Sequence, residues 1–493
     1  MPDKGLGSGV KIGLLGLVVL GISCIAPTYT ITSGLGPTIS QVGTHTPAVL
    51  LLGFLPMLLV AFSYKELNSR VPDSGTTFTW VTMAFGPWVG WMAGWTLVVA
   101  TVLVLANLAG VAVDFFFLLI AQIVGRPDIA DLSSHAAVNI PLTLVFVAIA
   151  CFVSYRGAES SKTTQRVLVA LQLVALGLFS VTALVEAYHG HAFDFTPVRA
   201  GWFNAFDVGS VSTLVAGVSL SIFMFWGWDV TLTMNEETDD PEKTPGRAAT
   251  ITIVTIIATY CLTCVAVICW AGIGSERLGA GNPDNQESIL AALAQPVMGR
   301  WSILMSIAVL CSSLSSLQST MVSPSRTLLS MSYYDAIPPA FRAISPRFHT
   351  PSTSTITAGV VSGGFYALVR MVSTTALWDT IATLGMMICL YYGTTALACV
   401  WYFRHELLDD VSCFCYKCLF PLVGGVILLV LAAVTMTQAY DPSYGSGSSI
   451  GGVGMVFILG MGILGLGVVL MIVSSTRRRE FFRGKTLPTA VSR

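Results

Sequence analysis

Long apolar runs, each separated from the next by a short polar segment, constrain the fold of this chain more than any other feature. A helix needs about 20 apolar residues to cross the hydrocarbon core of a bilayer. Charged residues make up only 10% of the 493 residues, and the mean hydropathy is +0.76, whereas an ordinary soluble domain carries roughly 25% charged residues. The sequence therefore predicts an all-α membrane protein. Twelve transmembrane helices are expected, near residues 12–40, 47–67, 88–121, 138–155, 165–188, 209–235, 248–272, 299–332, 353–370, 376–403, 416–437 and 450–474.

The basic residues support this number of spans. With both termini placed on the cytoplasmic side, 20 of the 25 lysines and arginines fall in inside segments. The five that fall outside are Arg126, Arg199, Arg277, Arg300 and Arg370. Cytoplasmic loops of membrane proteins carry an excess of Lys and Arg, and a missed span would scramble the alternation. We therefore expect a multi-pass protein of the cytoplasmic membrane with both termini inside.

Two of the twelve runs contain residues that break a helix. Pro27, in the first run, lacks a backbone N–H and clashes with the preceding turn. Gly227, in the sixth run, precedes a carboxylate, Asp229, in an otherwise apolar stretch. A proline or glycine kink needs no function, but interrupted helices at matching positions indicate the binding site of a secondary transporter.

Each broken run is the first of five, so the chain is expected to hold two five-helix halves of opposite membrane orientation within one transmembrane domain. The expected division is a first inverted repeat at 12–190, a second inverted repeat at 209–403, two further helices at 416–474 and a cytoplasmic tail at 475–493.

The backbone groups that a helix break frees need partners inside a membrane. Free N–H groups at the start of a half-helix favour a carboxylate, and free C=O groups at the end of one favour an ammonium or a metal ion. A zwitterionic amino acid satisfies both kinds of group, so an amino acid is the expected substrate. The residues expected to bind it lie at the two breaks: Ser23, Ile25, Ala26, Pro27, Thr28, Tyr29, Phe225, Trp226, Gly227, Trp228 and Asp229.

Four stretches together resemble the amino acid–polyamine–organocation (APC) superfamily of permeases. FWGWDVTLTMNEETDDPEKTPGRA (225–248) resembles the signature of its sixth span, and SYKELNSRVPDSGTTFTWV (63–81) the end of its second span with the following loop. AFGPWVGWMAGW (84–95) resembles the start of its third span, and SPSRTLLSMSYYDAIPPAFRAISPRFHTP (323–351) the end of its eighth.

The resemblance implies the leucine-transporter-type fold, with two inverted five-helix repeats and broken helices 1 and 6. It implies a substrate held at the breaks, with spans 3, 8 and 10 completing the site, and alternating access by a bundle that rocks against a scaffold. Phe223 matches the position of an aromatic residue that closes over the substrate from outside. Many family members have a Gly-Ser-Gly-like run where this chain has Ala26, Pro27 and Thr28, so one backbone donor is missing here.

Asp229 matches the acidic position of the sixth-span signature, and three roles remain open for it. It would contact an ammonium group of the substrate, carry a proton that couples transport to a proton gradient, or cap the second half-helix, where an acid satisfies free N–H groups.

The coupling ion, Na⁺ or H⁺, is also open. Sodium-coupled relatives of this fold use span-8 hydroxyls, which Ser312, Ser313, Ser315 and Ser316 would supply, although small hydroxyls also permit close helix packing. Some proton-coupled relatives have a lysine on span 5, where this chain has Gln172, which cannot titrate. Symport, antiport and exchange all remain open, and no cofactor is expected.

Two further groups have a functional and an ordinary interpretation. Charged residues at the expected cytoplasmic ends of spans 2, 6 and 8 would form an inner gate, or are charges at the membrane edge: Glu66, Arg70, Glu236, Glu237 and Arg326. A short cluster holds Cys413, Cys415 and Cys418, but structural zinc takes four ligands and no histidine lies alongside. We expect reduced thiols there and no metal site.

The sequence thus predicts a secondary active transporter, a permease that moves an amino acid across the membrane by alternating access. An amine or polyamine permease is the alternative, because Trp226 and Asp229 suit a cation. A membrane sensor or enzyme without transport is the alternative from another class, but no HExxH motif or histidine-rich set is present, so enzymatic activity is not expected. The expected partners are a small-molecule substrate and the lipid bilayer, and no nucleic acid.

Overall fold

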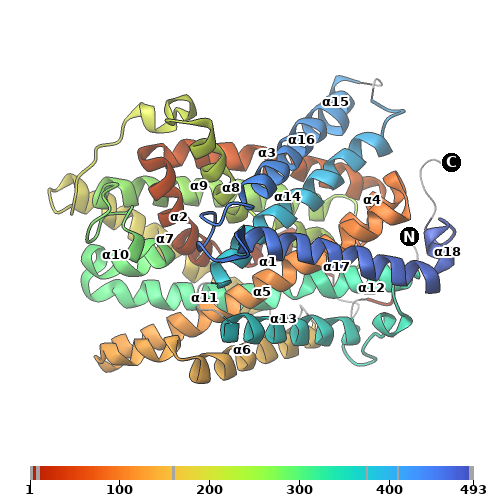
Figure 1. Ribbon diagram of the computed structural model, residues 1–493, viewed down its shortest axis with the longest axis horizontal. Coiled ribbons are helices and arrows are strands. Elements are labelled where there is room, and N and C mark those ends of the chain that lie inside the picture. Colours follow the sequence, from red (N-terminus) through yellow and green to blue (C-terminus); the bar gives the residue numbers. More distant parts are fainter. Residues whose placement is uncertain (1–3, 7–10, 158–161, 373–375, 408–409, 488–493) are drawn as a thin grey trace.

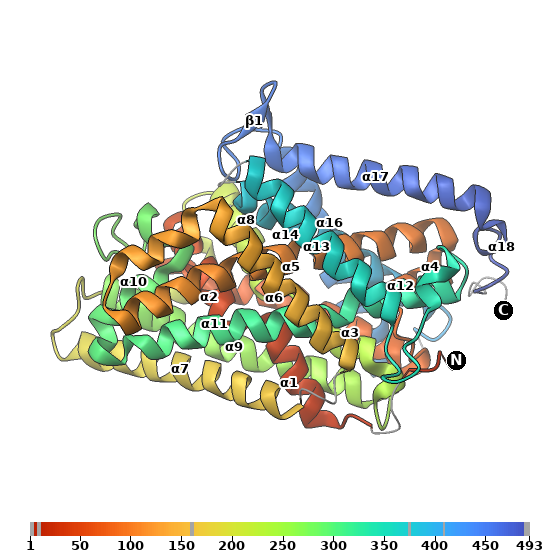
Figure 2. The same cartoon turned by 90° about the horizontal axis from the view of Figure 1, so that it is seen from below.

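The computed structural model describes residues 4–6, 11–157, 162–372, 376–407 and 410–487. Most of the long helices run along the longest axis of the molecule, and both chain termini lie at the same end of it (Figures 1 and 2). We call this the terminus end and the opposite one the far end. In the described residues, ten helical segments are long and apolar enough to cross a membrane.

The structure is mostly helical. The helices are α1 (Leu14–Ile25), α2 (Pro27–Val42), α3 (Thr46–Arg70), α4 (Thr77–Phe85), α5 (Pro87–Val124), α6 (Ala136–Arg156), α7 (Lys162–Tyr188), α8 (Val211–Met224), α9 (Thr244–Ala271), α10 (Ile289–Met298), α11 (Ile303–Thr320), α12 (Val322–Tyr333), α13 (Ser352–Val372), α14 (Ala376–Tyr402), α15 (Val411–Phe414), α16 (Phe420–Gln438), α17 (Met455–Arg477) and α18 (Arg479–Phe482). The strands β1 (Ser449–Ile450) and β2 (Val453–Gly454) pair antiparallel.

The ten apolar segments do not map one to one onto the twelve expected spans. One of them, Leu14–Arg70, is 57 residues long and holds the first two expected spans, and α13 is not among the ten. The number twelve therefore stays a prediction. The last expected span, 450–474, begins later than predicted, because Gly451 and Gly452 (φ 60° and 80°) turn the chain between β1 and β2 before α17 starts at Met455.

The first broken run forms α1 and α2, which meet at a single residue, Ala26. This residue has φ 56° and ψ 64°, a left-handed conformation that costs an L-residue roughly 1–2 kcal/mol. Pro27 is the first residue of α2, where its fixed φ suits a helix start and its missing N–H has no helical partner to lose. The break therefore lies one residue before the proline that predicts it.

The second broken run forms α8 and a short 3₁₀ helix, η6 (Trp228–Glu237), with residues 225–227 between them. Gly227 has φ 111°, a conformation that favours glycine. A Cβ atom at this position would lie 3.1 Å from Cys24 Sγ and 3.2 Å from the carbonyl carbon of Cys24. The two breaks, 200 residues apart in sequence, therefore contact each other through their backbones.

This contact predicts that Gly227→Ala destabilises the fold. The added methyl group must accept a strained φ and displace the backbone of Cys24, which we expect to cost about 1–3 kcal/mol. The measurement is the apparent unfolding temperature of the purified protein in detergent. Gly177→Ala is the matched control, because Gly177 lies in α7 with no atom near its missing Cβ; an equal loss in both variants would contradict the prediction.

Candidate functional site

The two breaks come together in the interior of the bundle and form the candidate site. All twelve residues predicted to bind substrate are buried, among them Ser23 and Trp228, which expose none of their surface, and Asp229, which exposes 3%. Asp229 is the one acidic residue among them. The structure thus brings the predicted residues of both breaks to one place.

Helix α11 supplies partners for backbone groups at the first break. Ser316 Oγ donates to the carbonyl oxygen of Cys24 (2.8 Å), and the N–H of Tyr29 donates to Ser312 Oγ (3.2 Å). The hydroxyl of Thr28, fully buried at the start of α2, has no hydrogen-bond partner among the described residues. The first break thus holds a C=O and an N–H that are paired by side chains of α11 instead of by their own helices, together with an unpaired hydroxyl.

The four serines predicted to bind a coupling ion fall into three groups. Ser312 and Ser316 meet the first break, as described. Ser315 faces α7 instead, where it accepts a hydrogen bond from Gln172 Nε2 (3.1 Å). Ser313 is buried, and its hydroxyl has no partner among the described residues.

An uncharged amide network joins α1, α7 and α11 beside the break. Gln165 accepts a hydrogen bond from Ser23 Oγ (2.7 Å) and donates to the carbonyl oxygen of Ser315 (3.2 Å) and to Gln318 Oε1 (2.5 Å). Sequence reasoning singled out Gln172 on α7 but missed Gln165, two helical turns earlier on the same face. The seven-residue spacing of the two glutamines was the sequence signal that could have indicated Gln165.

Asp229 and the predicted tryptophans of the second break lie against three tyrosines that the sequence did not predict. The Oδ1 atom of Asp229 accepts a hydrogen bond from the hydroxyl of Tyr392 on α14 (2.8 Å). Trp228 stacks on the Tyr392 ring, with centroids 5.0 Å apart, and Tyr64 of α3 meets both rings edge-on. Trp226 Nε1 donates to the hydroxyl of the neighbouring Tyr391 (2.5 Å). The aromatic side chains of the second break therefore pack onto α14 as well as onto each other.

The position of Asp229 bears on its three candidate roles. Gly227, rather than Asp229, is the N-cap residue of η6, and Asp229 lies in the first turn. An acid in the first turn still interacts favourably with the helix dipole. Its side-chain partner, however, comes from another helix, so it also connects η6 to α14.

The residues predicted to form an inner gate divide into two clusters at the terminus end. Glu236 and Glu237 end η6, where Glu236 pairs with Lys4 (3.0 Å) and Glu237 pairs with Arg326 of α12. Arg70 instead pairs with Glu406 in an exposed ion pair (2.5 Å). The backbone oxygen of Glu66 accepts a hydrogen bond from the side chain of Ser69 on the same helix. The sequence did not predict the part that Lys4 plays.

The cysteine cluster lies at the start of the helical segment that contains α16. Cys413 belongs to α15, and Cys415 and Cys418 lie in a short π-helical turn, η10 (Cys415–Leu419). All three are partly exposed free thiols. Among the described residues, no group of three or more His, Cys, Asp or Glu side chains is arranged to hold a metal ion.

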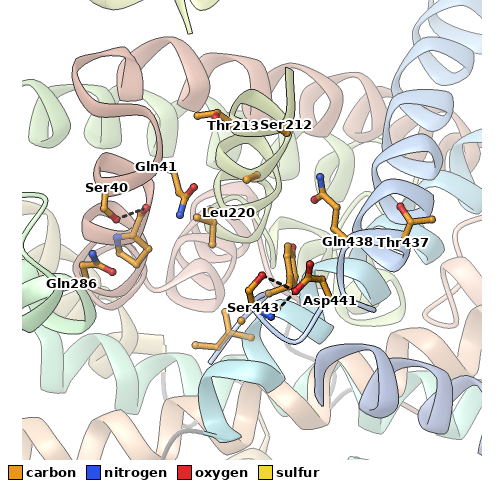
Figure 3. Close-up of a pocket in the computed structure, with 16 residues that line it drawn as sticks. Ser40, Gln41, Ser212, Thr213, Leu220, Gln286, Thr437, Gln438, Asp441 and Ser443 are labelled. Carbon is orange, nitrogen blue, oxygen red and sulfur yellow. Dashed lines mark hydrogen bonds between the residues drawn. The ribbon is translucent and has the colours of Figure 1, made fainter. Parts of the chain in front are cut away.

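A cavity of about 670 Å³ lies toward the far end, between α2, α8 and α16 (Figure 3). Its lining is mostly polar and contains one carboxylate and no basic residue. Leu220 of α8 lines it, and Phe223 follows on the next turn of the same helix toward the second break. The labelled polar side chains that line it are Ser40, Gln41, Ser212, Thr213, Gln286, Thr437, Gln438, Asp441 and Ser443.

Comparison with protein families decides the class of the chain. A family model described as amino acid permease matches residues 12–464. The chain belongs to the amino acid permease family. This confirms the resemblance to APC-superfamily permeases, and members of this family are transporters rather than enzymes.

The relatives of this chain include transporters that are named for different substrates. An uncharacterized transporter of Mycobacterium tuberculosis is 29% identical over 363 residues, covering 71% of this chain and 72% of the relative. The methylthioribose transporter of Bacillus subtilis is 21% identical, covering 72% and 74%. The Asc-type amino acid transporter 1 of Mus musculus is 24% identical, covering 71% and 62%.

A solved structure shares the fold. The crystal structure of MhsT in complex with L-phenylalanine matches 87% of this chain and 100% of its own, with a TM-score of 0.63 and 16% sequence identity. At this identity the match establishes the fold, while substrate and coupling ion need separate tests.

The hydrogen bond from α11 to the first break predicts a measurable stability difference between two serines. Ser316→Ala removes the donor to the Cys24 carbonyl and leaves a buried oxygen unpaired, which we expect to cost about 1–3 kcal/mol. Ser313→Ala is the matched control, because this equally buried hydroxyl on the same helix has no partner in the described structure. Thermal unfolding in detergent checks the difference, and equal losses for both variants would contradict it.

Proposed function

We propose that this permease is a secondary active transporter of amino acids that works by alternating access. The observation that carries the proposal is the direct contact of the two helix breaks, Cys24 against Gly227, deep inside the bundle. Broken helices that meet in this way supply both free carbonyls and free N–H groups in an apolar surrounding. The proposal includes two inverted five-helix halves, at 12–190 and 209–403.

The geometry of the first break supports an amino acid as substrate. The N-terminal end of α2 carries the unpaired Thr28 hydroxyl and the positive end of a helix dipole, which suit a carboxylate. The C-terminal end of α1 presents carbonyl oxygens, and that of Cys24, which accepts one hydrogen bond from Ser316, has a second lone pair for an ammonium group. The first break alone therefore offers complementary groups for a zwitterion, and the aromatic residues of the second break would contact its side chain.

The two ends of the molecule differ, and the difference supports a membrane orientation and a conformational state for the structure. Buried ion pairs close the terminus end, whereas a cavity lies toward the far end. The excess of Lys and Arg at the terminus end favours a cytoplasmic location for it. We infer that the structure represents the state that is closed to the cytoplasm, with the cavity as the route from outside and Phe223 between the cavity and the site.

An amine permease is the second candidate, and the surroundings of Asp229 favour it. Asp229 is a buried carboxylate that accepts a hydrogen bond from the Tyr392 hydroxyl and adjoins Trp228 in the chain, and an acid among aromatic side chains suits an organic cation. The hydrogen bond from Tyr392 already satisfies one carboxylate oxygen, so the cation would have to approach the other.

The decisive experiment is uptake into proteoliposomes of a panel of amino acids and amines, with sodium and proton gradients imposed separately. Uptake of amino acids but not of amines supports the proposal, and the reverse result supports the second candidate. Stimulation by one gradient identifies the coupling ion, and uptake only into vesicles loaded with substrate identifies exchange. Binding of a substrate without uptake or counterflow would overturn both candidates.

Asp229→Asn tests whether the buried carboxylate takes part in transport. The amide can still accept the hydrogen bond from Tyr392, so we expect normal expression and unfolding temperature. If the charge contacts an ammonium group or carries a proton, uptake falls by about tenfold or more. Asp128→Asn is the control, because Asp128 is an exposed carboxylate paired with Arg126. Normal transport by the Asp229 variant at every pH tested would leave only structural roles, in the first turn of η6 and in the contact with Tyr392 of α14.

A further inference from the structure

Lys4 is buried at the terminus end and joins three separate parts of the bundle. Its Nζ atom pairs with Asp73, which follows α3 (2.8 Å), and with Glu236 of η6 (3.0 Å). It also donates to Ser330 Oγ of α12 (2.9 Å) and to Ser74 Oγ (3.1 Å). A lysine is seldom fully buried unless its charge is paired, and here it has two carboxylates and two hydroxyls.

The segment that follows Lys4 is attached to η6 a second time. The N–H of Ile12 donates to the carbonyl oxygen of Glu237 (2.8 Å), and Ile12 and Thr238 form a parallel β-bridge. Lys11 Nζ donates to the carbonyl oxygen of Glu236 (2.8 Å). The N-terminal segment therefore fixes the end of η6 through both side chains and backbone.

Asp73 is the centre of this arrangement. It is fully buried, and besides the lysine it accepts hydrogen bonds from Thr79 Oγ1 (2.7 Å) and from the hydroxyl of Tyr334 (2.8 Å). Burial disfavours charge on both members of the pair, but their attraction outweighs it and holds the pKa of Asp73 below and the pKa of Lys4 above their usual values. Both groups are charged at neutral pH, so the contact is a true ion pair.

The C-terminal segment reaches the same place through Tyr334. Thr486 Oγ1 donates to the carbonyl oxygen of Tyr334 (2.6 Å), while the ring of Tyr334 lies 5.7 Å from Lys4 Nζ. Phe481 of α18 is 1% exposed and stacks on Phe78 of α4, with ring centroids 5.7 Å apart. Residues 478–487, the C-terminal segment, are therefore packed against α4 and α12.

We propose that Lys4 and the C-terminal segment, residues 478–487, form one lock that keeps the terminus end of the permease closed: Lys4 makes the ion pairs, and residues 478–487 hold Tyr334 and Asp73 in place. The proposal rests on the proposed transport function, because a substrate that leaves at the terminus end requires η6, the α3–α4 connection and α12 to separate. Lys4 bonds to all three, so its contacts must break in every cycle. The C-terminal segment then becomes a point from which transport can be regulated.

The first test measures opening directly and does not depend on the substrate. Cys24 lies at the break and is 3% exposed, so a membrane-impermeant thiol reagent added on the terminus side of sealed, oriented vesicles reaches it only when this end opens. Modification of Cys24 is read by mass spectrometry of its peptide. We expect Lys4→Met to speed modification by about tenfold, because one partner of a buried ion pair is lost.

Control variants separate opening from misfolding. Lys243→Met removes a charge from an exposed position that follows η6, and it should leave the rate unchanged. The double variant Lys4→Met with Asp73→Asn removes both buried charges of the pair and leaves no unpaired carboxylate at Asp73. It should keep a cooperative unfolding transition and still show faster modification. An unchanged rate in both Lys4 variants overturns the proposal.

The second test addresses the C-terminal segment. Phe481→Ala should also speed modification of Cys24, and its effect should be less than multiplicative with that of Lys4→Met, because both act on one lock. Phe206→Ala is the matched control, since Phe206 is 97% exposed and lies before α8. No effect of Phe481→Ala would remove the C-terminal segment from the lock. Faster modification together with no transport of any amino acid would retain the lock and overturn the proposed function instead.

Discussion

Backbone groups that have no helical partner, held inside an apolar bundle, are the constraint on which the rest of this structure depends. An unpaired N–H or C=O group is costly where no water can reach it. The structure answers this cost locally, because Ser316 of α11 donates to the Cys24 carbonyl and Ser312 accepts from the Tyr29 N–H. The groups that remain, including the Thr28 hydroxyl, are those that a substrate can satisfy. The same break that would weaken a structural helix thus creates a polar site in the membrane.

The breaks could be predicted from sequence because their causes are local. Proline lacks an N–H wherever it stands, and a glycine beside an acid in an apolar run has few structural explanations. The displacement of the first break to Ala26 is a detail that follows from the suitability of proline for the first turn of a helix. The matching positions of the two breaks, each in the first of five expected spans, supplied their pairing, which the contact between Cys24 and Gly227 now supports.

The partners of the site could not be predicted, because they depend on contacts between distant segments. Tyr392 reaches Asp229 across 163 residues of sequence, and Gln165 reaches Ser23 across 142. Tyrosine and glutamine in apolar helices have many possible roles, so nothing in the local sequence marks Tyr392, and the one signal for Gln165 is its seven-residue spacing from Gln172. The role of Lys4 was still harder to predict from the sequence. In the sequence it is one of many basic residues that fix the membrane orientation, and only the fold reveals that it is buried between two carboxylates.

The N-terminal segment, α1 and η6 together suggest how a change at the site reaches the terminus end. Helix α1 contacts η6 at the break, through Cys24 and Gly227, and the chain just before α1 contacts the other end of η6, through Ile12 and Thr238. Two elements joined at both ends move more readily as a unit than apart. A substrate that draws the two breaks together therefore acts on two elements that are also attached at the terminus end, by the cluster of Glu236, Glu237 and Lys4. Because η6 spans only ten residues and is kinked at Met234, one short, bent element joins the site to the ion pairs of the terminus end.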